Sequence, residues 1–339
     1  MSGRNASRSS GRGTGSTNAD GTAGAGPADA AEVFADLRPL MFSIAYRMLG
    51  SVTEAEDIVQ EAFLRYHRVV AANGPPDSPK AYLSAVTTRL CIDQLRSARA
   101  RRLSYVGDWL PEPLLTGPAP LTEPAPDPAA LAEQADSLSM AFLLLLERLS
   151  PVERAVFLLH DVFSYGYEET ASIVGRSVPT CRQLAHRARQ HVEENKPRFE
   201  ASPERRDELA ARFFGAVGQG DMDGLVSLLA EDVVVSGDNA GVPPAWLRPI
   251  VGRRNVSRLL AALGQQLLDA GATLDSVQVN GQPGALVRAP DGSLISVFVL
   301  DITDGQVQAV RSVIARGKLA HLGPLADLMA LRAAQRRPG

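Results

Sequence analysis

The segment YEETASIVGRSVPTCRQLAHRARQHV, residues 167–192, predicts two helices joined by a tight turn. Glu168–Val174 is expected to form the first helix, and Gly175 allows the chain to turn. Ser177 can then cap a longer helix that begins at Val178. Small or apolar residues occupy the packing positions, namely Ala171, Cys181 and Leu184. The pattern is that of a helix-turn-helix.

The second of these helices carries side chains that can donate to phosphates and base edges. They are Thr180, Arg182, Gln183, His186, Arg187 and Arg189. A solvated helix pair with ordinary surface arginines is the alternative. We favour DNA binding because residues 176–192 contain four arginines and no acid, a local charge of +4.

The net charge of the whole chain conceals this basic segment. The 339 residues suggest two or three domains, and Lys+Arg 35 against Asp+Glu 38 gives a formal charge of −3. That total argues against nucleic-acid binding. Along the chain, however, residues 80–102 carry +5, residues 103–134 carry −5, and the residues after 200 hold 14 acids and 14 bases.

The first basic segment, residues 80–102, is expected to be a helix with apolar and basic side chains interleaved. Arginines beside an aromatic ring suit single-stranded DNA or a melting duplex. An arginine-rich helix end stabilised by its own dipole is an equally weighted alternative. The basic side chains in the second half of this helix are Arg89, Arg96, Arg99, Arg101 and Arg102.

The acidic segment between the two basic ones is expected to be an extended linker, because Trp109–Pro128 contains seven prolines. It separates a helical unit at 31–102 from a second one at 135–195. In the first unit, Thr53 and Glu56 predict a capping box at the start of a helix. That helix places Glu54, Asp57 and Glu61 on one face, which suits a basic protein partner or is simply solvated.

Residues 204–316 are expected to form an α+β domain with a curved antiparallel sheet and helices on one face. Asp291-Gly292 and Asp304-Gly305 predict hairpins. The expected helices are 205–217, 223–229 and 253–269; the expected strands are 233–236, 273–279, 285–289, 294–302 and 306–314.

The composition of the chain ends and the number of cysteines exclude several classes of protein. Residues 1–30 hold 21 Gly, Ser, Ala or Thr and are expected to be a disordered tail, not a secretory signal; residues 317–339 are a second tail. Two cysteines exclude a disulfide scaffold and a cysteine-rich metal site. No apolar run is long enough to span a membrane. We expect a cytoplasmic protein with no cofactor and no metal.

Four motifs give the chain a family resemblance. They are LRPL at 37–40, AYRMLG at 45–50, EDIVQEAF at 56–63 and IDQLR at 92–96. They resemble region 2 of the extracytoplasmic-function (ECF) sigma factors of RNA polymerase. LSPVER at 149–154, followed by the helix-turn-helix, resembles sigma region 4. The resemblance implies two all-α sigma domains, region 2 as a helical bundle and region 4 as a helix-turn-helix.

The resemblance also implies partners, core RNA polymerase and promoter DNA. Asp57, Gln60 and Glu61 match the segment that docks on the clamp helices of the largest polymerase subunit. The residues implied for the −10 promoter element are Asp93, Arg96, Arg99, Arg101 and Arg102, to which the pattern of the basic helix adds Tyr82 and Arg89. Those implied for the −35 element are Arg176, Ser177, Thr180, Arg182, Gln183, His186 and Arg187.

A narrower resemblance concerns the linker. WLPEP, comprising Trp109, Leu110, Pro111, Glu112 and Pro113, resembles the linker motif of the ECF group with a C-terminal SnoaL-like domain, an NTF2-like cone. Relatives carry a DGGGK-like loop and an NPDKL motif associated with contact to the linker. This chain departs from both motifs, with GDNAGV at 237–242, which has no lysine, and ARGKL at 315–319; Asp238 and Lys318 are the residues expected to make the regulatory contact. We hypothesise that the cone packs on WLPEP and regulates the sigma regions in cis.

Two other classes remain as alternatives, a ligand-responsive DNA-binding repressor and an NTF2-like isomerase or cyclase with a DNA-binding appendage. A small ligand could occupy the SnoaL-like pocket. The candidate catalytic carboxylates are Asp232, Asp238 and Asp301, but no Asp/His pair has a compelling spacing. We therefore expect no catalytic residue.

Overall fold

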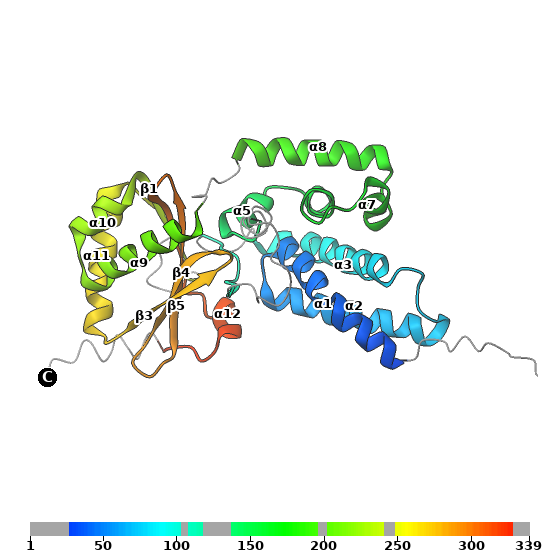
Figure 1. Cartoon of the computed structure of the whole chain (residues 1–339), viewed down its shortest axis with the longest axis horizontal. Helices are drawn as coiled ribbons and strands as arrows, with labels where there is room; N and C mark the ends of the chain where they lie inside the picture. Colours follow the sequence, from blue (N-terminus) through cyan, green and yellow to red (C-terminus); the bar gives the residue numbers. More distant parts are fainter. Residues whose placement is uncertain (1–26, 103–107, 118–136, 196–201, 241–247, 328–339) are drawn as a thin grey trace, which may run out of the picture.

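The structure is a computed structural model that describes residues 27–102, 108–117, 137–195, 202–240 and 248–327, without the side chains of 27–29, 98–102 and 195. Three parts lie side by side (Figure 1): the helices α1 to α3, the helices α5 to α8, and a C-terminal sheet with its helices. Among the helices described, none combines the length and the apolar character that crossing a membrane requires.

The first part consists of three long helices, α1 (Pro27–Leu49), α2 (Val52–Asn73) and α3 (Pro79–Arg102). α1 packs against both of the others, and α1 begins inside the segment assigned to the N-terminal tail. The predicted capping box at Thr53 is wrong. Ser51 is the N-cap of α2, and its hydroxyl accepts the Glu54 N–H. Thr53 lies within the first turn of α2, and its main-chain N–H donates a hydrogen bond to the carboxylate of Glu112.

The second part contains α5 (Met140–Leu146), α6 (Pro151–Phe157), a π-helical turn (Leu158–Val162), α7 (Tyr167–Val174) and α8 (Val178–Asn195). Ser150 and Glu153 form a capping box at the start of α6, with Pro151 in the first turn. Gly175 adopts φ 65°, and Ser177 accepts the Thr180 N–H. The predicted helix-turn-helix is therefore confirmed.

The two helical parts share one apolar core. Its buried side chains come from α1, α2 and α3 in the first part and from α5 to α8 in the second. The core contains, for example, Ile44 and Ile92 of the first part. From the second part it contains Leu146, Phe157 and Ile173. The acidic linker therefore joins two units that pack directly on each other.

The C-terminal part begins with α9 (Pro203–Gln219) and α10 (Met222–Leu228) and contains a six-stranded sheet of order β2-β1-β6-β5-β4-β3. The strands are β1 (Leu229–Asp238), β2 (Ile250–Val251), β3 (Thr273–Val279), β4 (Gln282–Arg288), β5 (Leu294–Thr303) and β6 (Gln306–Val313). α11 (Arg253–Asp269) lies between β2 and β3, and α12 (Arg316–Leu319) follows β6.

The prediction of a fully antiparallel sheet is wrong for one pair of strands, because β1 and β6 are parallel. Strands β3 to β6 follow one another through short hairpins and must alternate in direction. β1 enters the sheet from α10 and is separated from β6 by α11 and four strands, so no hairpin fixes their relative direction. The result is a mixed sheet. The hairpins predicted at Asp291-Gly292 and Asp304-Gly305 are present.

The two faces of the sheet have different neighbours. α9, α10 and α11 cover one face, where Phe213, Leu260 and Phe298 belong to a single apolar cluster. The interior of the cone is therefore filled by side chains. The other face packs on the linker and on α5, with Val297 beside Leu110 and Met140 in a second cluster. Figure 1 shows the sheet meeting the helical parts along this side.

Candidate functional site

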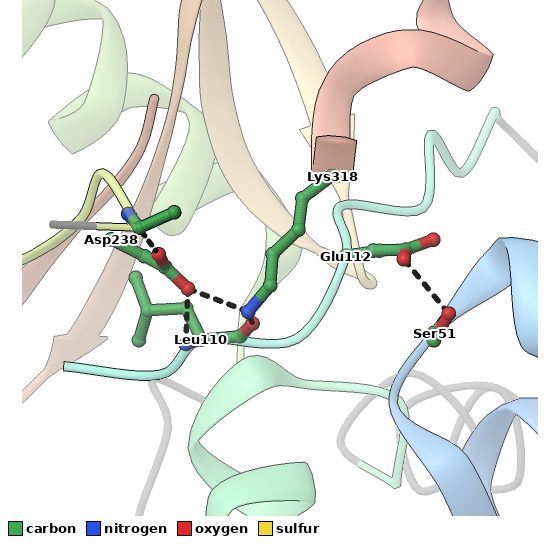
Figure 2. Close-up of polar contacts among 6 residues, drawn as sticks. Ser51, Leu110, Glu112, Asp238 and Lys318 are labelled. Atoms are coloured by element: carbon green, nitrogen blue, oxygen red, sulfur yellow. Dashed lines mark hydrogen bonds and ion pairs between the residues drawn. The ribbon is translucent and has the colours of Figure 1, made fainter. Parts of the chain in front are cut away.

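Linker residues 108–117 run between the C-terminal sheet and the first helical part, and their main chain is bound by two charged side chains (Figure 2). Asp238, at the end of β1, accepts the Leu110 N–H through Oδ2 at 2.8 Å. Lys318, in α12, donates to the same Oδ2 at 2.6 Å and to the Leu110 carbonyl oxygen. We call Asp238, Lys318 and the Leu110 peptide the linker dock.

The linker dock is a buried charged site. The Asp238 side chain is 0% exposed and that of Lys318 is 12% exposed. Burial lowers the pKa of Lys318, whereas the nearby Asp238 carboxylate acts in the opposite direction. Buried ions require a partner because their desolvation is costly. Removing either side chain would therefore leave the other charge buried and poorly compensated.

Trp109 extends the dock toward the first helical part. Lys318 Nζ lies 4.3 Å from the centroid of the indole ring, a cation–π contact. Gly50 lies against the same indole ring, so closely that a Cβ atom at this position would lie 2.8 Å from Trp109 Cη2. Gly50 also has φ 67°, a conformation that glycine adopts without strain. This glycine in the AYRMLG motif makes room for the tryptophan.

Glu112 attaches the linker to α2. Its carboxylate accepts the Thr53 N–H at 3.0 Å and the Ser51 hydroxyl at 2.8 Å, and its own N–H donates to the Gly50 carbonyl oxygen at 2.8 Å. A carboxylate at a helix N-terminus is favoured by the unpaired N–H groups and the dipole there. One residue further on, His321 donates from Nε2 to the Pro113 carbonyl oxygen at 2.8 Å. WLPEP is therefore held from both sides.

Asn280 is a site residue that the sequence analysis missed. Its side chain is fully buried, and Nδ2 donates to Tyr46 Oη at 2.6 Å and to the Leu138 carbonyl oxygen at 3.0 Å. Its Oδ1 accepts the Leu114 N–H at 3.0 Å. One side chain thus joins the sheet, α1, the linker and the start of the second helical part. The Asn280-Gly281 dipeptide is a hairpin signal, but nothing in it identifies these partners.

The residues predicted for the −35 element lie together on the outer side of the helix-turn-helix. Arg182, Gln183, His186 and Arg187 are exposed on α8, and Arg176 and Ser177 are exposed just before it. Thr180 is partly buried and hydrogen-bonds the Ser177 hydroxyl at 2.8 Å. We call these seven residues the recognition face. The prediction that Arg189 is exposed on this helix is wrong, because Arg189 pairs with Asp161 and donates to Tyr167 Oη.

The residues predicted to contact polymerase lie on one side of α2, and we call Asp57, Gln60 and Glu61 the polymerase face. Asp57 and Gln60 are exposed, and Glu61 is partly buried in an ion pair with Arg65 at 2.7 Å. Glu54, predicted on the same acidic face, instead accepts a hydrogen bond from Gln94 on α3.

The residues predicted for the −10 element lie along α3 in different environments. Asp93 is exposed beside Arg96, with 3.5 Å between the charged atoms, and Tyr82 packs against Tyr66. Arg89 donates hydrogen bonds to α7. The side chains of Arg99, Arg101 and Arg102 lie outside the described residues.

The candidate catalytic carboxylates do not come together. Asp232 is exposed, Asp238 belongs to the linker dock, and Asp301 pairs with Arg311 at 2.6 Å. A cavity of about 490 Å³ lies outside the cone, between the linker, α9 and β3, with Leu115, Phe214 and Val277 among its lining residues. Within the described ranges no group of His, Cys, Asp and Glu could hold a metal ion.

Comparison with known families matches all three parts of the chain. Residues 33–101 match sigma-70 region 2, residues 139–192 match sigma-70 region 4, and residues 210–313 match the SnoaL-like domain. The helices that carry the polymerase face and the recognition face lie within the first two matches. Asp238 of the linker dock lies within the third match, and Lys318 follows shortly after its end.

Individual relatives share the same organisation over most of their length. The ECF RNA polymerase sigma factor SigJ of Mycobacterium tuberculosis is 40% identical over 290 residues, covering 82% of this chain and 89% of SigJ. The probable sigma factor SigI of the same species is 32% identical over 280 residues, covering 82% and 90%. The crystal structure of SigJ superposes with a TM-score of 0.66 at 34% identity, covering 87% of this chain and 99% of that one.

The chain therefore belongs to the ECF family of RNA polymerase sigma factors, the proteins that direct transcription initiation at promoters. Its sigma regions are followed by a SnoaL-like domain of the α+β, NTF2-like class.

Proposed function

We propose that this sigma factor binds core RNA polymerase through the polymerase face and reads the −35 element through the recognition face. The observation that carries the proposal is the exposed surface of α8 over residues 178–192, which holds no acid and presents four side chains able to donate to DNA on one side of the helix. Because α8 is packed through Cys181, Leu184 and Ala185, that surface is presented outward. Phosphates would be neutralised by Arg182 and Arg187.

The proposed −10 contact is made by α3. Asp93, Arg96 and the arginines that follow would lie along the opened strand, where positive charge is needed and no duplex geometry has to be matched. The polymerase face carries the opposite charge and would be repelled by DNA. It suits a basic surface of the polymerase clamp helices. We place this activity in the cytoplasm, where polymerase transcribes.

We further propose that the SnoaL-like domain regulates the sigma regions in cis through the linker dock. Asp238 and Lys318 bind the Leu110 peptide from the sheet side, and Glu112 binds α2 from the other side. The linker thus couples the domain to the helix that carries the polymerase face. Because the domain is tethered, its effective concentration is high and individually weak contacts suffice.

No catalytic role is proposed for the SnoaL-like domain. Among the described residues, Asp301 is paired with Arg311, and the three candidate carboxylates Asp232, Asp238 and Asp301 lie in different surroundings. The family matches do not favour the ligand-responsive repressor that the sequence analysis kept as an alternative. A repressor would bind the promoter but would not confer initiation on core polymerase.

Promoter-specific transcription with core polymerase tests the proposal and separates it from the repressor. We expect transcripts with the wild-type chain, about tenfold fewer with Asp57→Ala at limiting polymerase, and similarly reduced −35 binding with Arg182→Ala, because one good contact is worth about 1–3 kcal/mol. Asp77→Ala removes another exposed carboxylate and serves as the control. Promoter binding without any transcript would support the repressor instead.

A further inference from the structure

Tyr167, the first residue of α7, contacts two arginines of the recognition helix α8. The guanidinium carbon of Arg182 lies 5.5 Å from the centroid of the tyrosine ring. Arg189 donates from Nη2 to the Tyr167 hydroxyl oxygen at 2.9 Å. Arg182 belongs to the recognition face, whereas Arg189 is paired with Asp161. The ring and the hydroxyl of one side chain therefore bind different arginines of the same helix.

The Tyr167 ring is itself held in place by the π-helical turn that precedes α7. The imidazole of His160 stacks on it, with 3.9 Å between the ring centroids and an angle of 25° between the planes. His160 Nδ1 lies 2.8 Å from the Tyr165 carbonyl oxygen, which orients the imidazole. Asp161, the next residue of the turn, pairs with Arg189. Single π-helical turns are frequent at functional sites, and this turn supports both groups of Tyr167.

A fixed aromatic ring restricts an arginine that would otherwise be free on the helix surface. An exposed arginine has many rotamers, and binding DNA in one of them costs conformational entropy. A tyrosine ring attracts a guanidinium and lets it stack, so Arg182 has a partner that holds it before DNA binds. Arg187 provides the contrast on the same face. Its side chain is 64% exposed and lies 3.7 Å from the Glu153 carboxylate, a surface pair that contributes little.

We propose that Tyr167 is a positioning residue for the −35 contact, with its ring holding the Arg182 guanidinium ready for DNA and its hydroxyl stabilising region 4 through Arg189. The inference deepens the proposed function and rests on the assignment of the recognition face to the −35 element. An exposed cation–π contact corresponds to about a two- to fivefold change in affinity. Removal of the ring should therefore weaken −35 binding by about that factor.

Binding of a −35 duplex to full-length variants tests the proposal. Tyr167→Leu should lower the affinity about two- to fivefold, whereas Tyr167→Phe, which keeps the ring and loses only the hydroxyl, should bind as wild type does. In an Arg182→Ala background, Tyr167→Leu should have no further effect, because no guanidinium is left for the ring to hold. In the matched Arg187→Ala background it should keep its full effect. Equal effects of Tyr167→Leu in the two backgrounds would overturn the proposal.

A spectroscopic measurement on the free full chain tests the same contact without DNA. The ring current of Tyr167 should shift the side-chain proton resonances of Arg182, because the guanidinium lies close to the ring. The shift should persist in Tyr167→Phe and be lost in Tyr167→Leu. An Arg182 spectrum that is identical in wild type and Tyr167→Leu would refute positioning by the ring, whatever the effect of that variant on folding.

Failure of the proposed function has a different signature. In that case Arg182→Ala would bind the −35 duplex as tightly as wild type does, while the ring-current shift of Arg182 in the free wild-type chain was retained. The contact would then exist without a role in −35 recognition, and the positioning role of Tyr167 would be overturned together with the recognition face.

Discussion

At the scale of single residues, the linker dock depends on two charges that satisfy each other and also bind the main-chain N–H and carbonyl oxygen of Leu110. Lys318 Nζ lies 2.6 Å from Asp238 Oδ2, in surroundings that exclude most water. Replacing one member of such a pair leaves an uncompensated buried ion, whereas replacing both removes the problem. The two kinds of substitution should therefore have very different costs.

We predict that Asp238→Asn or Lys318→Met alone lowers the free energy of unfolding by about 3–5 kcal/mol. The double variant should cost clearly less than the sum of the two single changes, because neither ion is left alone. Denaturant unfolding of the four full-length proteins measures this coupling. Additive losses would show that the pair does not act as a unit.

The sequence alone allowed part of this site to be predicted. Asp238 and Lys318 were singled out through the resemblance of short motifs, and Trp109 through WLPEP. Asn280 was not, because its role depends on Tyr46 and Leu138, which are distant in sequence and brought close only by folding. A buried polar side chain is defined by its partners, and a single sequence does not show them.

At the scale of elements, the SnoaL-like domain requires a close approach of α9 and α11. Gly264 of α11 lies against the end of α9, where a Cβ atom would be 1.8 Å from the Val217 carbonyl oxygen. The obstacle is main chain, so it cannot move aside as a flexible side chain would. Gly215, within α9, faces open space.

We therefore expect Gly264→Ala to destabilise the protein by about 1–3 kcal/mol, the usual range for overpacking. Gly215→Ala is the matched control and should be neutral or stabilising by up to about 1 kcal/mol, since alanine favours the helix. Thermal unfolding of both variants measures the difference. Equal stabilities would contradict the packing described for α9 and α11.

Most elements follow from local sequence patterns, and the exceptions have physical reasons. The turn at Gly175 and the hairpin at Asp304-Gly305 were predicted because their conformations are local. The parallel pairing of β1 with β6 was not, because strands far apart in sequence choose their direction through the whole sheet. The exposure of Arg189 was also predicted wrongly, since Asp161 reaches it only through the π-helical turn.

At the scale of the whole molecule, the linker is the element on which all three parts meet. Glu112 binds the start of α2, Leu110 is held by the dock, and Leu114 is bound by Asn280. A change in the linker should therefore reach the polymerase face without altering the recognition face, whose residues make none of these contacts. The account predicts that the two activities can be separated.

The most direct measurement is transcription with core polymerase by Trp109→Ala and Pro111→Ala variants, alongside binding of a −35 duplex to the same proteins. The account predicts severalfold altered transcript yield with −35 affinity unchanged, because both residues lie in the linker and neither lies on α8. Met222→Ala, at an exposed position of the SnoaL-like domain, should change neither. Wild-type transcription from both linker variants would contradict control through the linker.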